Sequence, residues 1–251
     1  MKWKTSISCI KDGKEIVRGH DLQELIATKS FVEVACLILR GVLPKENETK
    51  MLNALFVSAI DHGVGAPSTT VARTVASCGN SMHTALASGV LAMGERHGGA
   101  IEGAAKFFQE NTQEEERKEM RNRDNDAAIL VAKLKEEKAR IPGYGHKVLV
   151  RDLRAEKLLA IAKDLAIYAS CCGFAEEVER ELNKISSKPL PLNIDGAMAA
   201  ILSDMGFDWR MMKGLFVIAR MPGLVAHAYE ELTNDEGVRR IDEGEVEYQG
   251  G

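Results

Sequence analysis

The pattern of apolar and polar positions predicts a mainly helical chain. β-Favouring residues lie on both sides of Asp12-Gly13 in TSISCIKDGKEIVRG, and this dipeptide suits the type I′ turn of a hairpin. A second alternation, EVEYQ at 245–249, predicts a short strand near the C-terminus. Strand-like patterning is confined to these two ends. We therefore expect a mainly α fold with a short N-terminal β-hairpin.

Two capping boxes predict where the first helices begin. Asp21 with Glu24, and Ser30 with Glu33, have the spacing in which a side chain and a backbone N–H cap each other reciprocally. Gly41 is placed to end the second helix, because glycine accepts the left-handed conformation of a helix C-terminus. SFVEVACLILRG is therefore predicted to be a short, mostly buried helix.

The rest of the chain is predicted to form helices that differ in composition. Residues 67–94 are rich in Ala, Ser, Thr and Gly, which would let helices pack with close backbones in a crowded core or a subunit interface. Residues 104–140 lack Pro and Gly and carry a dense charge run, which predicts a solvated helix with one apolar stripe. Further helices are expected at 153–186, 195–205 and 208–232, the last interrupted near Met221-Pro222-Gly223.

Composition excludes several classes of function. With 33 basic and 37 acidic residues among 251, the net charge is −4, so no global field would recruit nucleic acid or an acidic membrane. Five scattered cysteines without CxxC spacing indicate a reducing compartment, and no apolar run approaches the ~18 residues that span a bilayer. We expect a cytoplasmic protein whose anion sites are local.

The motifs that remain are histidines beside glycines. No GxxxxGK[ST], strand-associated GxGxxG or HExxH is present, which predicts no nucleotide hydrolysis, no dinucleotide redox chemistry and no metal site. Three histidines stand beside glycine in such motifs, namely His62 in DHG, His97 in HGGA and His146 in GYGH. A single such histidine is more often a core or surface residue, but three of them point to a site.

The third histidine lies in IPGYGHKVLVRDLR, where Pro142, Gly143 and Gly145 exclude a regular helix. A glycine-lined loop lets a ligand approach the backbone, and the basic residues that follow could hold carboxylates or phosphates. The alternative interpretation is a helix entry with solvated basic side chains.

Taken in order, these motifs resemble the citrate synthase family across nearly the whole chain. The order is DHG, HGGA, PGYGH followed by DxR, then NxD, then FxxAR with GxxAH. Only about fifteen residues separate Pro44 from Asp61, where a citrate synthase has a long helical stretch, and this compact form resembles citryl-CoA lyase and the lyase module of ATP-citrate lyase. The resemblance implies one citrate synthase-like unit over 1–251, within which roughly 104–205 forms a smaller mobile helical subdomain.

The resemblance also implies roles for individual residues. His62 would contact the oxaloacetate half of the substrate, His97 would donate to the thioester carbonyl, and His146 would bond the oxygen on the carbon attacked or released. Asp195 would move the proton of the acetyl methyl group. Further implied contacts are Arg154 and Arg220 with substrate carboxylates, Lys147 with an anion, and Pro142, Gly143, Tyr144 and Gly145 with the adenine of coenzyme A.

Some of these positions allow other interpretations. Asp195 is equally suited to be the N-cap of the helix GAMAAILSD. Condensing relatives supply a partner-subunit arginine near the C-terminus, but here the stretch reads RRIDEGEVEYQG, so Arg239 or Arg240 carries no predicted catalytic role. His227 matches the family's GxxAH without a chemical task, and a structural role is expected for it.

The resemblance favours a citryl-CoA lyase that forms acetyl-CoA and oxaloacetate by enol chemistry. It would have no tightly bound cofactor, with coenzyme A entering as part of substrate or product. The alternatives are a citrate or 2-methylcitrate synthase, and a non-catalytic CoA-binding or scaffolding subunit. Expected partners are an acyl-CoA, a di- or tricarboxylate, and further copies of the chain in a homodimer or homotetramer.

Overall fold

The computed structural model describes residues 2–117, 123–137, 139–145, 151–234 and 236–250. Its N-terminal unit is an antiparallel sheet in the order β1-β2-β3, followed by α1 (Leu22–Thr28) and α2 (Phe31–Arg40). The strands are β1 (Ser8–Lys11), β2 (Lys14–Val17) and β3 (His20–Asp21). This unit has a small core of its own, built on Val17, Leu25 and Leu37. The predicted hairpin is confirmed, and a two-residue third strand extends it.

Local signals account for these elements. Asp12 and Gly13 both have positive φ, 51° and 76°, as a type I′ turn requires. The Ser30–Glu33 capping box is present, and Gly41 ends α2 in the left-handed conformation with φ 88°. Asp21 caps α1 by accepting the N–H of Gln23. No reciprocal bond from Glu24 is present among the described residues, so the predicted N-cap is confirmed but the predicted capping box is not.

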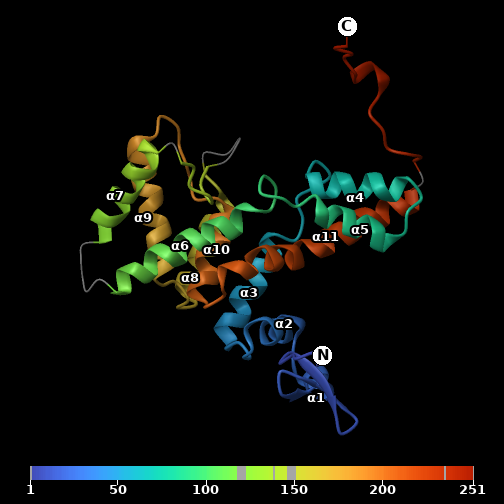
Figure 1. Cartoon of the computed structure of the whole chain (residues 1–251), viewed down its shortest axis with the longest axis horizontal. Coiled ribbons are helices and arrows are strands. Elements are labelled where there is room, and N and C mark those ends of the chain that lie inside the picture. Colours follow the sequence, from blue (N-terminus) through green and yellow to red (C-terminus); the bar gives the residue numbers. More distant parts are fainter. Residues whose placement is uncertain (1, 118–122, 138, 146–150, 235, 251) are drawn as a thin grey trace.

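The remaining helices surround one large core (Figure 1). They are α3 (Glu46–Ser58), α4 (Pro67–Ser77), α5 (Met82–Leu91), α6 (Ala100–Arg117), α7 (Arg123–Glu136), α8 (Leu153–Asp164), α9 (Ser170–Ile185), α10 (Ile194–Asp204) and α11 (Met212–Asn234). Helix α10 lies at the centre and packs against α6, α8 and α9. Every residue from Gly196 to Leu202 is buried, which explains the uninterrupted apolar sequence GAMAAIL.

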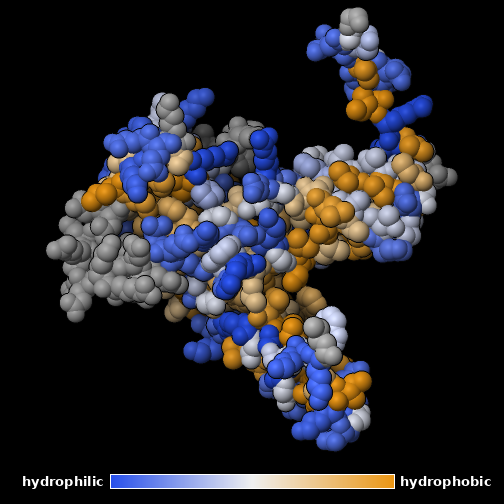
Figure 2. Space-filling view, viewed as in Figure 1, coloured by the Kyte–Doolittle hydropathy of each residue, from blue (hydrophilic) through white to orange (hydrophobic). Residues whose placement is uncertain are grey.

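Helices α4 and α5 pack closely with α11 and form an arm that projects from the body (Figure 1). A Cβ at Gly89 would lie 3.0 Å from the carbonyl oxygen of Ser68 and 3.1 Å from the Ala72 Cβ, so any larger residue would press the two helices apart. The prediction of crowded packing from the small residues is therefore confirmed. Figure 2 shows hydrophobic side chains along this arm and over the N-terminal unit, and Leu91 and Tyr229 are 85% and 63% exposed.

Three predicted elements were wrong. The helix expected over 153–186 is two helices, α8 and α9, separated by a turn with Ala166 at φ 54°. Helix α11 is not interrupted but continues through Pro222. The strand expected at 245–249 does not form, because a 3-10 turn at Glu243–Glu245 is followed by irregular chain. The tail projects from the arm without a partner strand in the described chain (Figure 1).

The charge-rich helical stretch begins earlier than predicted, at Ala100. Its described parts are α6 and α7. No described helix combines the length and apolarity that crossing a bilayer requires.

Candidate active site

The HGGA motif forms a tight turn between α5 and α6 that presents His97. The turn needs its glycines, because a Cβ at Gly98 would lie 2.9 Å from the Phe216 ring, and one at Gly99 would lie 2.5 Å from the Gly94 carbonyl oxygen. The Gly94 oxygen also accepts the N–H of His97 at 3.0 Å. The histidine is therefore held by its own backbone, and its ring is half-buried.

The start of α4 fixes the tautomer of His97. Its Nε2 accepts the backbone N–H of Ser68 at 3.3 Å and lies 2.9 Å from the Ser68 hydroxyl. A backbone N–H can only donate, so Nε2 carries no proton and Nδ1 carries it. Burial lowers the pKa of His97, and the charges of Arg220 and His62 lower it further. His97 is thus a neutral imidazole whose Nδ1–H can donate to a ligand.

Asp195 lies in the first turn of α10, where Asn193, not Asp195, is the N-cap. The Asn193 side chain accepts the N–H of Gly196 at 3.1 Å, so the alternative interpretation of Asp195 as the cap was wrong. Burial raises the pKa of Asp195 above that of an ordinary carboxyl group, and Asp152 adds to this, while Arg154 and Arg220 oppose it. A carboxylate with a raised pKa is a better proton acceptor, as a general base requires.

Arg220 brings a buried guanidinium to the same place from α11. Its side chain donates from Nε to the Ala59 carbonyl at 2.7 Å, and its plane lies over the Phe216 ring at 5.1 Å. The NH1 nitrogen is buried and has no hydrogen-bond partner within the described chain. Burial lowers the pKa of Arg220, and the carboxylates of Asp61 and Asp195 act against that. A buried donor without a partner is costly, and a ligand carboxylate would satisfy it.

Arg154 lies in the first turn of α8 and is paired with its own N-cap. Its Nε and NH2 donate to Asp152 at 3.1 and 2.9 Å, and Asp152 also accepts the N–H of Ile194 at 3.0 Å. Asp152 therefore joins the starts of α8 and α10. Burial opposes its ionisation, but these hydrogen bonds and the Arg154 charge hold the pKa of Asp152 below its usual range.

The DHG motif forms the turn that follows α3 and contributes His62. Gly63 has φ 72°, and its N–H donates to Asp61 at 3.0 Å. A Cβ at Gly223 would lie 2.5 Å from the Ile60 carbonyl oxygen, so this glycine of GxxAH lets the turn pack directly on α11. The His62 charge acts on His97, which places the two rings in one neighbourhood.

The PGYG loop packs against the start of α10. A Cβ at Gly143 would lie 2.8 Å from the Cα of Gly196, and the Gly143 carbonyl accepts the N–H of Asn193 at 3.0 Å. Tyr144 is 4% exposed and donates its hydroxyl to the Ala175 carbonyl, so its ring belongs to the core. Half-buried Pro142 and Gly145 offer the loop's remaining surface to a ligand. His146 and Lys147 lie outside the described residues.

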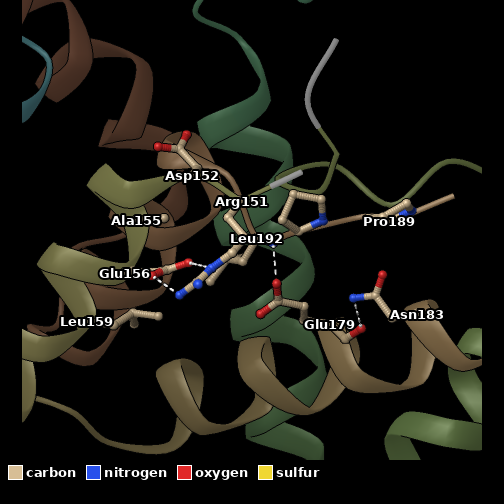
Figure 3. A pocket seen from close by; sticks show the side chains of 10 residues that line it. Arg151, Asp152, Ala155, Glu156, Leu159, Glu179, Asn183, Pro189 and Leu192 are labelled. Atoms are coloured by element: carbon tan, nitrogen blue, oxygen red, sulfur yellow. Dashed lines mark hydrogen bonds and ion pairs between the residues drawn. The ribbon is translucent and has the colours of Figure 1, made fainter. Parts of the chain in front are cut away.

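A cavity of about 270 Å³ borders the site at Asp152 (Figure 3). It lies between α8, α9 and the segment before α10. Arg151 pairs with Glu156 at 2.6 Å, and Glu179 accepts the N–H of Leu192 at 3.0 Å. None of the predicted site residues that the structure describes lines it, so the cavity is separate from the cluster of His62, His97, Arg154, Asp195 and Arg220. Among the described residues, no group of three or more His, Cys, Asp or Glu could hold a metal ion.

The structure thus brings five predicted residues to one place: His62, His97, Asp195, Arg154 and Arg220, whose charges act on one another. It also adds contributors to which the sequence analysis assigned no role. Ser68 sets the His97 tautomer, Asp152 holds Arg154, and Asp61 acts on Arg220. Asp61 and Asp152 lie within the DHG and DxR motifs, which was a signal for them, whereas no motif includes Ser68.

The family model described as "Citrate synthase, C-terminal domain" matches residues 44–241. The chain belongs to the citrate synthase family. Within this family, the structure of citryl-CoA lyase from Hydrogenobacter thermophilus is 45% identical, with a TM-score of 0.91 over 99% of this chain and 95% of that one. The match begins at residue 44, where the N-terminal unit with its separate core has ended.

Two further known proteins are similar to this chain. ATP-citrate synthase beta chain protein 1 of Arabidopsis thaliana is 30% identical over 73% of this chain and 31% of its own length. The ATP citrate lyase of Methanothrix soehngenii, solved with citrate and coenzyme A, is 22% identical, with a TM-score of 0.84 over 100% of this chain and 42% of that one, and it shares the fold. The chain spans about a third to a half of the length of the curated relatives it matches.

Proposed function

We propose that this protein is a citryl-CoA lyase, which cleaves citryl-CoA to acetyl-CoA and oxaloacetate. The observation that carries the proposal is the 45% identity to the Hydrogenobacter thermophilus citryl-CoA lyase over nearly the full length of both chains. The arrangement of a neutral histidine donor, a carboxyl group of raised pKa and a buried arginine supports it, because carbon–carbon cleavage beside a thioester needs these three groups.

Cleavage would begin with loss of the proton from the citryl hydroxyl group, for which His146 is the candidate acceptor. The carbon–carbon bond breaks, the hydroxyl carbon becomes the keto carbon of oxaloacetate, and the electron pair passes to the thioester as an enolate. The Nδ1–H of His97 would donate to the enolate oxygen, and such a preplaced donor contributes about 3 to 4 kcal/mol. Asp195, whose pKa is raised by burial, would in its protonated form then give its proton to the carbon to form acetyl-CoA.

Arg220 and Arg154 would bind the carboxylates of the oxaloacetate half. The orphaned NH1 of Arg220 is suited to one of them, since a guanidinium and a carboxylate form strong charge-assisted hydrogen bonds. His62 would also contact the oxaloacetate half of the substrate. Pro142 to Gly145 would receive the adenine of coenzyme A, chiefly through Pro142 and Gly145, and Lys147 would bind an anion.

The test is to supply citryl-CoA to the purified protein and measure acetyl-CoA and oxaloacetate. We expect the two products in equal amounts. A parallel assay supplies acetyl-CoA with oxaloacetate and measures free thiol. Stoichiometric release of coenzyme A in that assay would contradict the proposal in favour of a citrate or 2-methylcitrate synthase, and no turnover in either assay would favour a CoA-binding or scaffolding subunit.

We further propose that the protein acts as a homodimer or homotetramer. The arm of α4, α5 and α11 exposes Leu91, Val225 and Tyr229, whereas helices packed on a single chain bury such residues. Sedimentation velocity at micromolar concentration should show a dimer or a larger assembly, and replacing Leu91 with lysine should weaken it, because a charge would enter an apolar contact. A monomer at this concentration would contradict the prediction.

A further inference from the structure

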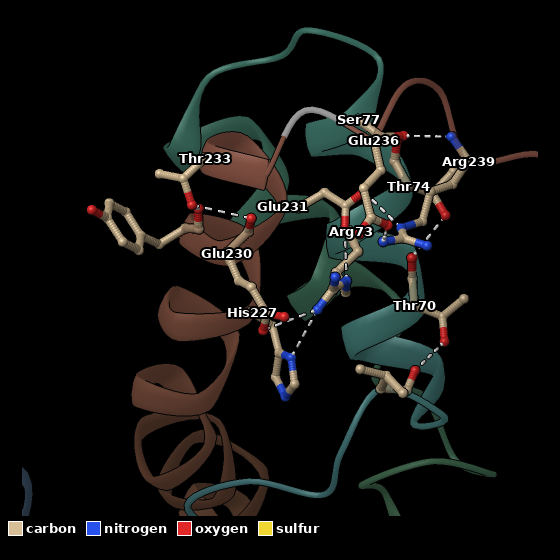
Figure 4. A network of polar contacts seen from close by, with 12 residues as sticks. Thr70, Arg73, Thr74, Ser77, His227, Glu230, Glu231, Thr233, Glu236 and Arg239 are labelled. Carbon is tan, nitrogen blue, oxygen red and sulfur yellow. Dashed lines mark hydrogen bonds and ion pairs between the residues drawn. The ribbon is translucent and has the colours of Figure 1, made fainter.

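A network of charged side chains connects the arm to the DHG turn (Figure 4). Arg73 of α4 donates from Nε to Glu231 of α11 at 2.7 Å, and the two side chains are only 9% and 2% exposed. The other Glu231 oxygen accepts Nε of Arg239 at 2.6 Å. Two arginines thus neutralise one buried carboxylate, and the position of the Arg73 guanidinium is fixed.

Arg73 in turn determines the protonation of His227. Its NH1 lies 3.4 Å from Nδ1 of His227. A guanidinium can only donate hydrogen bonds, so Nδ1 must accept and the ring proton lies on Nε2. That Nε2 is 3.2 Å from Oδ1 of Asp61, and the His227 side chain is only 15% exposed. His227 is therefore a donor aimed at a carboxylate.

Asp61 is the residue around which the DHG turn is built. Burial opposes its ionisation, but the backbone N–H groups of Gly63 and His62, together with His227, hold the pKa of Asp61 below its usual value. Oδ2 accepts the Gly63 N–H at 3.0 Å, while Oδ1 faces His227. The Asp61 carboxylate also acts on the charge of Arg220. The orientation of this one carboxylate thus affects His62 and Arg220, two of the residues proposed to hold the oxaloacetate half.

We propose that His227 is a positioning residue for the dicarboxylate end of the site. Held in its Nε2–H tautomer by Arg73, it fixes the Asp61 carboxylate, which shapes the turn that presents His62 and lies near Arg220. His227 does not contact substrate in this role. The kinetic part of the proposal rests on the proposed function, whereas the tautomer does not.

The tautomer can be measured without any substrate. Nitrogen NMR of the full chain labelled at histidine should show one ring, absent from the spectrum of His227→Gln, with its proton on Nε2 at neutral pH. Each partner alone requires the proton on Nε2, because Arg73 can only donate to Nδ1 and the Asp61 carboxylate can only accept from Nε2. The preference should therefore be lost only when Arg73→Met is combined with Asp61→Ala. A proton on Nδ1 in the unmodified chain, or an unchanged ring in the combined variant, would overturn the proposal whether or not citryl-CoA is a substrate.

The kinetic test compares two replacements of similar size. His227→Leu removes the donor, whereas the amide nitrogen of Gln can take the place of Nε2. For Leu we expect about a tenfold weaker affinity for oxaloacetate as a product inhibitor, the scale of a lost charged hydrogen bond, with inhibition by acetyl-CoA unchanged. Gln should restore most of the oxaloacetate affinity. Equal losses for both inhibitors, or equal effects of Leu and Gln, would contradict a positioning role.

A second variant covers the case in which His227→Leu fails to fold. Asp61→Asn keeps the shape of the side chain and removes its charge, and it should produce the same selective loss of oxaloacetate affinity. In a double-mutant cycle the combined variant should lose no more than the larger single loss, because the two residues act through one interaction. Additive losses would show that they act independently.

Discussion

Replacing Asp195 with asparagine should lower the turnover of citryl-CoA by about 10² to 10⁴, the usual contribution of a positioned acid or base. Asparagine has nearly the same shape as aspartate but cannot exchange a proton at carbon. Steady-state kinetics will measure the loss. The alkaline limb of the wild-type kcat/KM profile should reflect this group, because Asp195 must be protonated to act as the acid and its pKa is raised above that of an ordinary carboxyl group.

The same replacement should not destabilise the fold at neutral pH. A carboxyl group whose pKa is raised on folding contributes stability at pH values below its ordinary pKa, and that contribution is lost as pH rises through the raised value. At neutral pH, which lies well above the ordinary pKa of a carboxyl group, the raised pKa of Asp195 thus costs stability, and the neutral amide should melt at the same temperature or higher. Thermal melts at neutral pH and near about pH 4 will show the difference.

Asp164→Asn is the matched control for this prediction. Asp164 is an exposed carboxyl group at the end of α8, remote from the arginine and histidine cluster. It should leave both turnover and melting temperature unchanged. Near-normal turnover of Asp195→Asn, with a normal melt, would mean that Asp195 moves no proton and that the proposed chemistry is wrong at its centre.

Replacing His97 with alanine should cost about 10² to 10³ in kcat, since it removes one preplaced donor to a developing oxyanion. The tautomer fixed by Ser68 makes the prediction more specific. The donor is Nδ1, and the amide nitrogen of asparagine can lie where Nδ1 lies, whereas that of glutamine reaches the place of Nε2. His97→Asn should therefore recover part of the turnover and His97→Gln should recover little.

Two controls separate this role from packing. His83 is exposed on α5 and bonds only with Ser81 among the recorded contacts, so His83→Ala should leave kcat unchanged. Ser68→Ala removes the hydroxyl but keeps the backbone N–H, so its effect should stay within about tenfold. Better rescue by glutamine than by asparagine would show that Nε2, not Nδ1, is the donor.

The elements with local signals were predictable, and those that depend on distant contacts were not. The Asp12-Gly13 turn and the Ser30–Glu33 box are set by residues that touch their neighbours in sequence. The alternation in EVEYQ is equally local, but a strand forms only when another strand takes up its backbone hydrogen bonds, and none is available in the described chain.

Pro222 shows the opposite case, a local signal that packing overrides. Proline inside a helix costs about 3 kcal/mol. The residues on either side, including Leu215 and Leu224, are buried, and each fully buried leucine contributes about 1.5 to 3 kcal/mol. The packing of both halves of α11 thus offsets the cost of the proline, and the helix continues.

The residues of the candidate site also fall into two groups, those that the sequence predicted and those that only the fold reveals. The glycine neighbours of His62 and His97 identified both histidines, and the spacing of family motifs identified Asp195, Arg154 and Arg220. The partners that tune them could not be read from the sequence. Ser68 is joined to His97, and Asp61 to His227, only by the fold, and no periodicity connects positions so far apart.

The close approach of Gly143 to Gly196 has a consequence for mutational tolerance. The two backbones touch, so any side chain at either position would separate the PGYG loop from the start of α10. In a saturation screen for activity, both positions should reject every substitution, as we also expect of Asp195. Substitutions at these glycines would fail because the added side chain pushes two main chains apart, and not because a contact with a ligand is lost. Within this motif, therefore, the positions least tolerant of change need not be the ones that perform the chemistry.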